Sequence, residues 1–142
     1  MGMEFYGNSY KGNDEPIFVG ILTFLKLPWI RSHEELKSVR PDVAIIGEPF
    51  DFGTTIRPGA RYGPRAIRAA STVPSPPYEH FNIETGVDPF GVFRTVDYGD
   101  VNVSPGDVVE SHRRMTNKVK EVLDLDGIPV MLGGDHSITF AN

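Results

Sequence analysis

Two short runs of apolar residues constrain the fold of this chain more than any other feature of its sequence. Residues 43–47 are Val-Ala-Ile-Ile-Gly and residues 128–132 are Ile-Pro-Val-Met-Leu, with proline or glycine at the boundaries. Runs of this length without polar alternation are typical of strands buried on both faces of a parallel sheet. A third strand is expected at residues 93–98, where Asp97 weakens the apolar pattern.

Helices are expected before the first of these strands and between the strands. Ser32 is a suitable N-cap for a helix at residues 33–39, and Pro64 suits the first position of a helix at residues 64–70. The clearest helical pattern follows Ser104, which we expect to cap a helix whose first residue is Pro105. Its apolar stripe comprises Val108, His112, Met115, Val119, Val122 and Leu123. The alternation predicts βαβ units, an α/β fold with a parallel sheet and helices on both faces.

The sharpest functional motif follows the last predicted strand, at Gly133-Gly134-Asp135-His136-Ser137. Functional residues of parallel sheets collect at the carboxyl ends of the strands, and two glycines leave space there for a ligand or an ion. Imidazole is the commonest metal ligand, and a neighbouring carboxylate can fix its tautomer. In the alternative interpretation, Asp135 or Ser137 caps the next helix and His136 makes only a hydrogen bond.

Other polar residues admit a functional and a structural interpretation. Residues 57–68 contain four arginines, which suit an anion site but more often pair with carboxylates and hold a long loop. Asp97 and Asp100 lie at the end of a predicted strand and could serve a metal or act as a base, but capping of the next turn is favoured. His112 lies on the apolar stripe of its helix, which favours a core or edge histidine over a ligand.

Composition excludes several classes of protein. The net charge of −5 argues against a nucleic-acid binder, and the absence of cysteine excludes disulfides, cysteine–zinc sites and a thiol nucleophile. The apolar run at residues 17–25 falls far short of the roughly 18 residues of a membrane span. No signal peptide is visible, so a cytoplasmic location is expected. Residues 1–16 are polar and are expected to form a flexible arm.

Several motifs in order resemble the ureohydrolases, the family of the arginase, agmatinase and guanidinobutyrase enzymes, and are closest to the agmatinase-like branch. They are Thr23-Phe24-Leu25-Lys26-Leu27-Pro28, the stretch from Gly47 to Arg68 with its Pro49-Phe50-Asp51 and Arg57-Pro58-Gly59-Ala60-Arg61-Tyr62-Gly63-Pro64 segments, Tyr98-Gly99-Asp100-Val101, and Gly133-Gly134-Asp135-His136-Ser137-Ile138-Thr139. The resemblance covers residues 17–140 and implies a three-layer α/β/α fold with a parallel sheet.

The resemblance also implies a chemistry. In the family a binuclear metal site, usually with two Mn²⁺ ions per subunit, activates water to hydrolyse a linear guanidino compound such as agmatine to urea and an amine. By this resemblance His136 matches the first metal-ligand histidine, and Asp135 and Ser137 are supporting residues. Mixed oxygen and imidazole ligation suits Mn²⁺, although nickel or cobalt would accept similar ligands. The complete enzyme is expected to form a homo-oligomer with no nucleic-acid or membrane partner.

The chain departs from the family by lacking its other metal-ligand motifs. The family's Asp-x-His-x-Asp motif is absent, and Asp124-Leu125-Asp126 follows a predicted helix instead of a strand. One histidine cannot hold two metal ions. We therefore expect residues 1–142 to be the N-terminal portion of one domain, with its fold in residues 17–142, a sheet limited to the leading strands, and no hydrolysis when alone. The alternative is a non-catalytic interaction or regulatory module.

Overall fold

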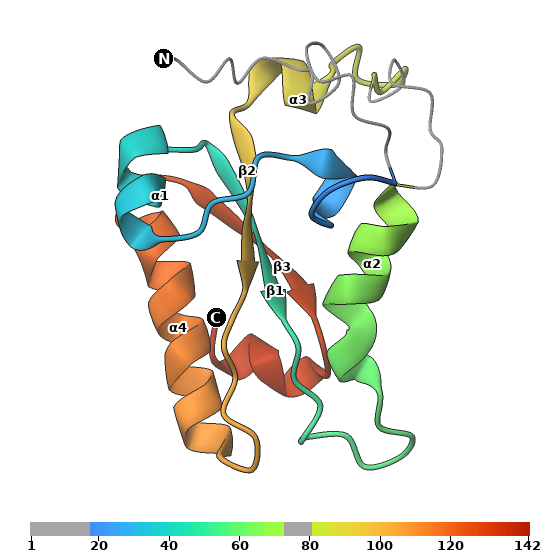
Figure 1. Ribbon diagram of the computed structural model, residues 1–142, viewed down its shortest axis with the longest axis vertical. Coiled ribbons are helices and arrows are strands. Elements are labelled where there is room, and N and C mark those ends of the chain that lie inside the picture. Colours follow the sequence, from blue (N-terminus) through green and yellow to red (C-terminus); the bar gives the residue numbers. More distant parts are fainter. Residues whose placement is uncertain (1–17, 73–80) are drawn as a thin grey trace.

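A parallel sheet of three strands forms the centre of the protein (Figure 1). The computed structural model describes residues 18–72 and 81–142. Strands β1 (Val43–Glu48), β2 (Thr95–Asp100) and β3 (Ile128–Gly133) lie in the order β2-β1-β3, and both pairings are parallel. The parallel sheet predicted from the apolar runs is confirmed, although β2 begins two residues later than the predicted 93–98 because Val43 pairs with Thr95.

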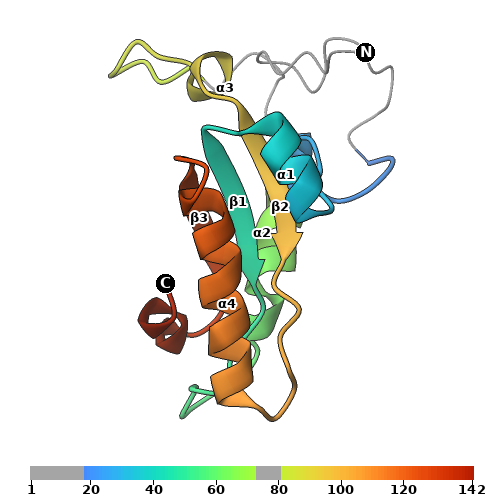
Figure 2. The same cartoon turned by 90° about the vertical axis from the view of Figure 1, so that its left-hand side faces the viewer.

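Helices cover both faces of this sheet, which gives the expected three layers (Figures 1 and 2). The α-helices are α1 (His33–Val39), α2 (Gly63–Ser71), α3 (Pro89–Val92) and α4 (Val108–Leu123), and the 3₁₀ helices are η1 (Phe24–Lys26), η2 (Ala60–Tyr62) and η3 (His136–Phe140). Helices α1 and α4 lie on one face and α2 on the other.

The core is divided by the sheet because successive side chains of β1 point to opposite faces. Ile46 belongs to the larger apolar cluster, with Leu36 of α1 and Met115 of α4, whereas Ile45 packs in a smaller one with Leu27. β1 is therefore buried on both faces, as predicted. The same prediction for residues 128–132 is wrong at Ile128 and Val130, whose side chains are exposed; β3 has only one neighbouring strand among the described residues.

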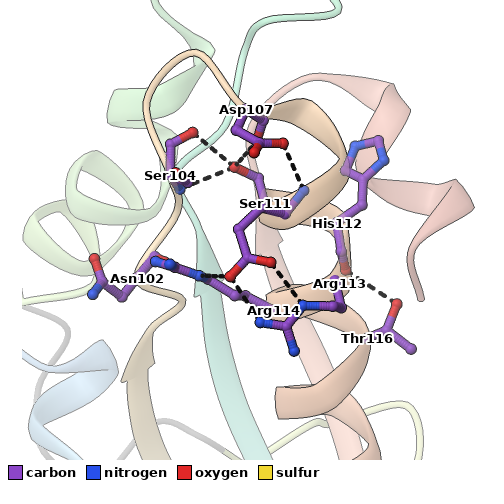
Figure 3. A network of polar contacts seen from close by, with 9 residues as sticks. Asn102, Ser104, Asp107, Ser111, His112, Arg113, Arg114 and Thr116 are labelled. Carbon is purple, nitrogen blue, oxygen red and sulfur yellow. Dashed lines mark hydrogen bonds and ion pairs between the residues drawn. The ribbon is translucent and has the colours of Figure 1, made fainter.

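Helix α4 begins at Val108, so the prediction that Pro105 is its first residue is wrong (Figure 3). The carboxylate of Asp107 accepts the backbone N–H of Glu110 at 2.9 Å and is the N-cap. The preceding turn is held instead by the buried Ser111 hydroxyl, which donates to the carbonyl oxygen of Asp107 at 2.8 Å and accepts the N–H of Ser104 at 3.0 Å. The N-cap of α4 is therefore Asp107 and not the predicted Ser104.

The predicted flexible arm at residues 1–16 lies outside the described residues. After it, Leu27 and Ile30 are buried, whereas Phe18 and Trp29 are exposed. This segment is therefore anchored to the sheet and still presents apolar side chains to solvent. In the described part of the chain, no helix combines the length and the apolar character that crossing a membrane requires.

Candidate functional site at the carboxyl edge of the sheet

The turn after β3 is fixed on the loop after β1, because parallel strands end at the same edge of the sheet. The N–H of Asp135 donates to the carbonyl oxygen of Phe50 at 2.8 Å, and the N–H of Gly53 donates to the Asp135 carboxylate at 2.7 Å. A Cβ atom at Gly134 would collide with the Phe50 carbonyl. The two segments approach closely only because residue 134 is glycine.

Both carboxylate oxygens of Asp135 accept hydrogen bonds from neighbouring residues. Oδ2 accepts from Gly53, while Oδ1 accepts the N–H of Ser137 at 2.8 Å and its hydroxyl at 2.5 Å. Burial opposes ionisation of Asp135, but the hydrogen bonds from Ser137 and Gly53 outweigh it and lower the pKa of the carboxyl group. Asp135 is thus the N-cap of η3, as the structural interpretation predicts. The same contacts brace the residues on either side of His136.

His136 is the exposed member of this turn. Its Nδ1 lies 3.4 Å from the hydroxyl oxygen of Thr139, and the described residues provide no other polar contact to the ring. η3 lies below the strand arrowheads in Figure 1, at the edge where the three strands end. An imidazole that is exposed on a braced turn can bind a ligand from outside the described residues. Its role as a metal ligand stays a prediction.

The described residues do not form a two-metal centre. Nowhere in residues 18–72 and 81–142 do three or more histidine or acidic side chains gather as a metal would require. Asp135 is occupied by its own hydrogen bonds. His136 therefore fits as one ligand of a metal ion, and the other ligands would have to come from elsewhere.

The two aspartates of β2, Asp97 and Asp100, pair with an arginine of α2. The Arg68 guanidinium, 5% exposed, forms two hydrogen bonds to Asp97, Nε to Oδ2 at 2.7 Å and Nη2 to Oδ1 at 2.9 Å. Its Nη1 donates to Asp100 at 2.5 Å. Asp97 also accepts the N–H groups of Phe24 and Gly99. The favoured prediction that these aspartates cap the next turn is therefore wrong for Asp97, whose principal partner, Arg68, the sequence did not identify.

Asp51 organises the loop that follows β1. Its buried carboxylate forms an ion pair with Arg61 and accepts the N–H of Gly59 at 2.7 Å. The Arg61 hydrogen bond is the largest cause that lowers the pKa of Asp51, to about 2. Pairing of arginines with carboxylates is confirmed for Arg61 and Arg68. The described residues provide no ion pair for Arg57 or Arg65.

Sequence reasoning missed Glu48, a carboxylate inside the fold. Glu48 is fully buried at the end of β1, where Oε2 accepts the Asn142 amide N–H at 2.9 Å and Oε1 has no hydrogen-bond partner among the described residues. Burial raises the pKa of Glu48 more than the Asn142 hydrogen bond lowers it. The sequence feature that could have identified Glu48 is a charged residue directly after the apolar run at residues 43–47.

His112 lies where the apolar stripe of α4 predicted it. Its ring packs at 5.2 Å from the ring of Phe50, and its Nε2 atom is buried with no hydrogen-bond partner among the described residues. Figure 3 shows the ring directed away from the polar network at the start of the helix. The core or edge position is confirmed, and nothing in this geometry makes His112 a ligand.

Comparison with known proteins gives consistent matches. The model of the arginase family matches residues 41–142. A guanidinobutyrase of Pseudomonas aeruginosa is 39% identical over 128 residues, which cover 90% of this chain and 38% of that protein. The solved structure of proclavaminate amidino hydrolase from Streptomyces clavuligerus has a TM-score of 0.72 at 35% identity, over 89% of this chain and 39% of that one. Formiminoglutamase of Trypanosoma cruzi, solved with Mn²⁺, has a TM-score of 0.59 at 29% identity, over 71% of this chain and 34% of that one. The chain thus spans less than two-fifths of the length of each of these proteins.

Proposed function

The chain belongs to the arginase family, and on that premise we propose that it is the N-terminal part of a metal-dependent hydrolase of a linear guanidino compound. The observation that carries the proposal is the exposed His136 on a turn that Asp135 fixes to the loop after β1. Similarity to a guanidinobutyrase and to an amidino hydrolase supports the substrate class.

Within that enzyme, His136 would be one ligand of a manganese ion, and Asp135 and Ser137 would hold its turn. A solved relative that contains Mn²⁺ supports the choice of metal. Bound metal supplies the acidity that allows water to attack the guanidinium carbon near neutral pH. The residues of this chain contribute position: the hydrogen bonds of Asp135 and Ser137 limit the freedom of the His136 backbone. Agmatine or guanidinobutyrate is the proposed substrate, and a homo-oligomer the proposed assembly.

A non-catalytic interaction module is the second candidate. The exposed apolar side chains of Phe18, Ile21 and Trp29 favour it, as does the exposed Ile128 of the edge strand β3. Apolar groups that gather at a surface commonly mark contact with another protein surface. This candidate needs no metal site within the chain.

Urea release from agmatine and from guanidinobutyrate distinguishes the two candidates. We expect the purified 142-residue chain with Mn²⁺ to release no urea, and the complete translation product of the gene to release it. Downstream sequence should then encode an in-frame Asp-x-His-x-Asp motif. Urea release by the 142-residue chain alone would contradict the proposed dependence on other residues. A stop codon directly after Asn142, with stable soluble expression, would favour the interaction module.

A further inference from the structure

We propose that Glu48 is a positioning residue, which fixes the His136-bearing helix η3 against the carboxyl end of β1 through Asn142. The proposal rests on the proposed function only in giving His136 a chemical role. The attachment of η3 itself is a property of the fold and can be measured without metal or substrate.

The environment of Glu48 requires an explanation. A glutamate is almost never fully buried unless it is paired, because removing its carboxyl group from water carries a large free-energy cost. Glu48 has no exposed surface and, in the described part of the chain, no cationic partner; the one hydrogen bond that its side chain makes there comes from Asn142 at 2.9 Å. An apolar residue would fill this position at lower cost. The hydrogen bond to Asn142 is therefore the one interaction that only a polar residue at position 48 can make.

The hydrogen bond between Glu48 and Asn142 matters because Asn142 comes shortly after η3 in the chain. η3 carries His136 at its first position and ends two residues before Asn142. Its beginning is held by Asp135, through the contacts to Gly53 and Phe50. Without a second attachment, the short helix could rotate about that point and carry the imidazole with it.

The second attachment has one contact from α4 and one from β1. The Thr116 hydroxyl donates to the carbonyl oxygen of Ala141 at 2.5 Å, and Glu48 accepts from Asn142. Ile138 and Ala141 are buried in the larger core cluster between these contacts. The end of η3 is thus fixed to a helix and to a strand, and Glu48 is the contact from the sheet.

Glu48→Gln and Glu48→Leu separate the hydrogen bond from the volume of the side chain. Glutamine keeps an oxygen that accepts from Asn142, whereas leucine fills similar space without one. Glu121→Leu is the matched control, because Glu121 is a carboxylate of α4 that accepts from the Tyr98 hydroxyl at 2.5 Å and has no contact with η3 among the described residues. All variants are made in the complete translation product that contains residues 1–142.

The first readout is amide hydrogen exchange of Ile138 and Ala141 in metal-free protein, since both amides donate within the η3 turn. Loss of one hydrogen bond, worth about 1 kcal/mol, should make exchange roughly fivefold faster in Glu48→Leu. Glu48→Gln and Glu121→Leu should exchange as the wild type does. The urea midpoint of Glu48→Leu should not fall, because an apolar group replaces a buried carboxyl group with an unpaired oxygen.

The second readout is Mn²⁺ affinity, which should weaken about tenfold in Glu48→Leu and recover in Glu48→Gln, as for residues that orient a metal ligand. Unchanged exchange at Ile138 and Ala141 in Glu48→Leu would overturn the proposal. If that variant does not fold, Asn142→Leu removes the same bond from the exposed side and must give the same faster exchange. Absence of Mn²⁺ binding in the wild type would refute the proposed function, and the exchange result would still decide the role of Glu48.

Discussion

Two polar groups lie at the carboxyl edge of the same sheet and differ in what their side chains contact. The buried Arg68 and Asp97, together with the exposed Asp100, form an ion-pair cluster that joins α2 to β2. His136 lies on the turn after β3 with its ring exposed, and Thr139 makes the one polar contact to the ring that the described residues provide. Side chains that are paired inside the fold hold elements together, whereas the imidazole that is exposed to solvent remains available for a ligand.

Arg68→Met should have the largest effect on stability. The substitution leaves Asp97, which is 1% exposed, without its cationic partner. Removal of one member of a buried ion pair costs about 3–5 kcal/mol in the free energy of unfolding, because the remaining charge is uncompensated. Urea unfolding followed by circular dichroism measures this loss.

Arg65→Met is the control for Arg68→Met, because Arg65 lies exposed on the same helix. Its free energy of unfolding should stay within about 0.5 kcal/mol of the wild type. Equal losses in the two variants would mean that the cluster is not the structural element described above.

Gly134→Ala tests the contact between the turn that carries His136 and the loop that follows β1. A methyl group there would meet the Phe50 carbonyl, and overpacking of this kind costs about 1–3 kcal/mol. Gly91→Ala is the control, because the nearest atom, of Asp88, is 3.4 Å from the added carbon. A Gly134→Ala protein as stable as the wild type would show that the turn and the loop can separate at no cost.

Asp51→Asn tests the ion pair of the loop after β1 through the pH dependence of the stability of the protein. The pKa of Asp51 is lowered from 3.8 to about 2 in the folded protein by Arg61. Its stabilising contribution is therefore present above pH 3.8 and is lost as the pH falls toward 2. The urea midpoint should fall less between about pH 5 and pH 3 in Asp51→Asn than in the wild type.

Asp124→Asn is the control for this pH dependence, since Asp124 is exposed at the end of α4. It should lose stability with acid as steeply as the wild type does. A slope unchanged by Asp51→Asn would contradict the role of the Asp51–Arg61 pair.

The strands were predictable because burial on both faces leaves a continuous apolar run, as at Ile45 and Ile46. The start of α4 was not, because Ser104 and Asp107 are both good caps. In the structure the Asp107 carboxylate caps the helix, and the backbone of Ser104 bonds to the buried Ser111 hydroxyl instead. Two suitable cap residues three positions apart leave the first residue of a helix undetermined by the sequence pattern.

The candidate site was predictable in its position and not in its pairings. Gly133 to Ser137 form a motif within five residues, so the turn could be identified locally. The partner of Arg68 lies 29 residues away, and Asn142 lies 94 residues from Glu48. Contacts of that range depend on which strands are neighbours and in what register, which the pattern of one sequence does not specify.

His136→Ala should have the smallest effect on stability and the most direct effect on function. Because the ring is exposed and makes one polar contact with the residues that the structure describes, we expect the free energy of unfolding to change by less than about 0.5 kcal/mol. His33→Ala is the control, because His33 lies on α1 and not on the turn after β3. Its Nδ1 lies 3.7 Å from the carboxylate of Glu121 of α4. Both variants should therefore remain folded.

Manganese content of the complete translation product is the measurement that decides whether His136 carries the chemistry. We predict that His136→Ala loses one of the metal ions bound per subunit and that His33→Ala loses none. An unchanged metal content in His136→Ala, in a protein that still unfolds at the wild-type urea midpoint, would contradict the assignment of this edge of the sheet as the metal site.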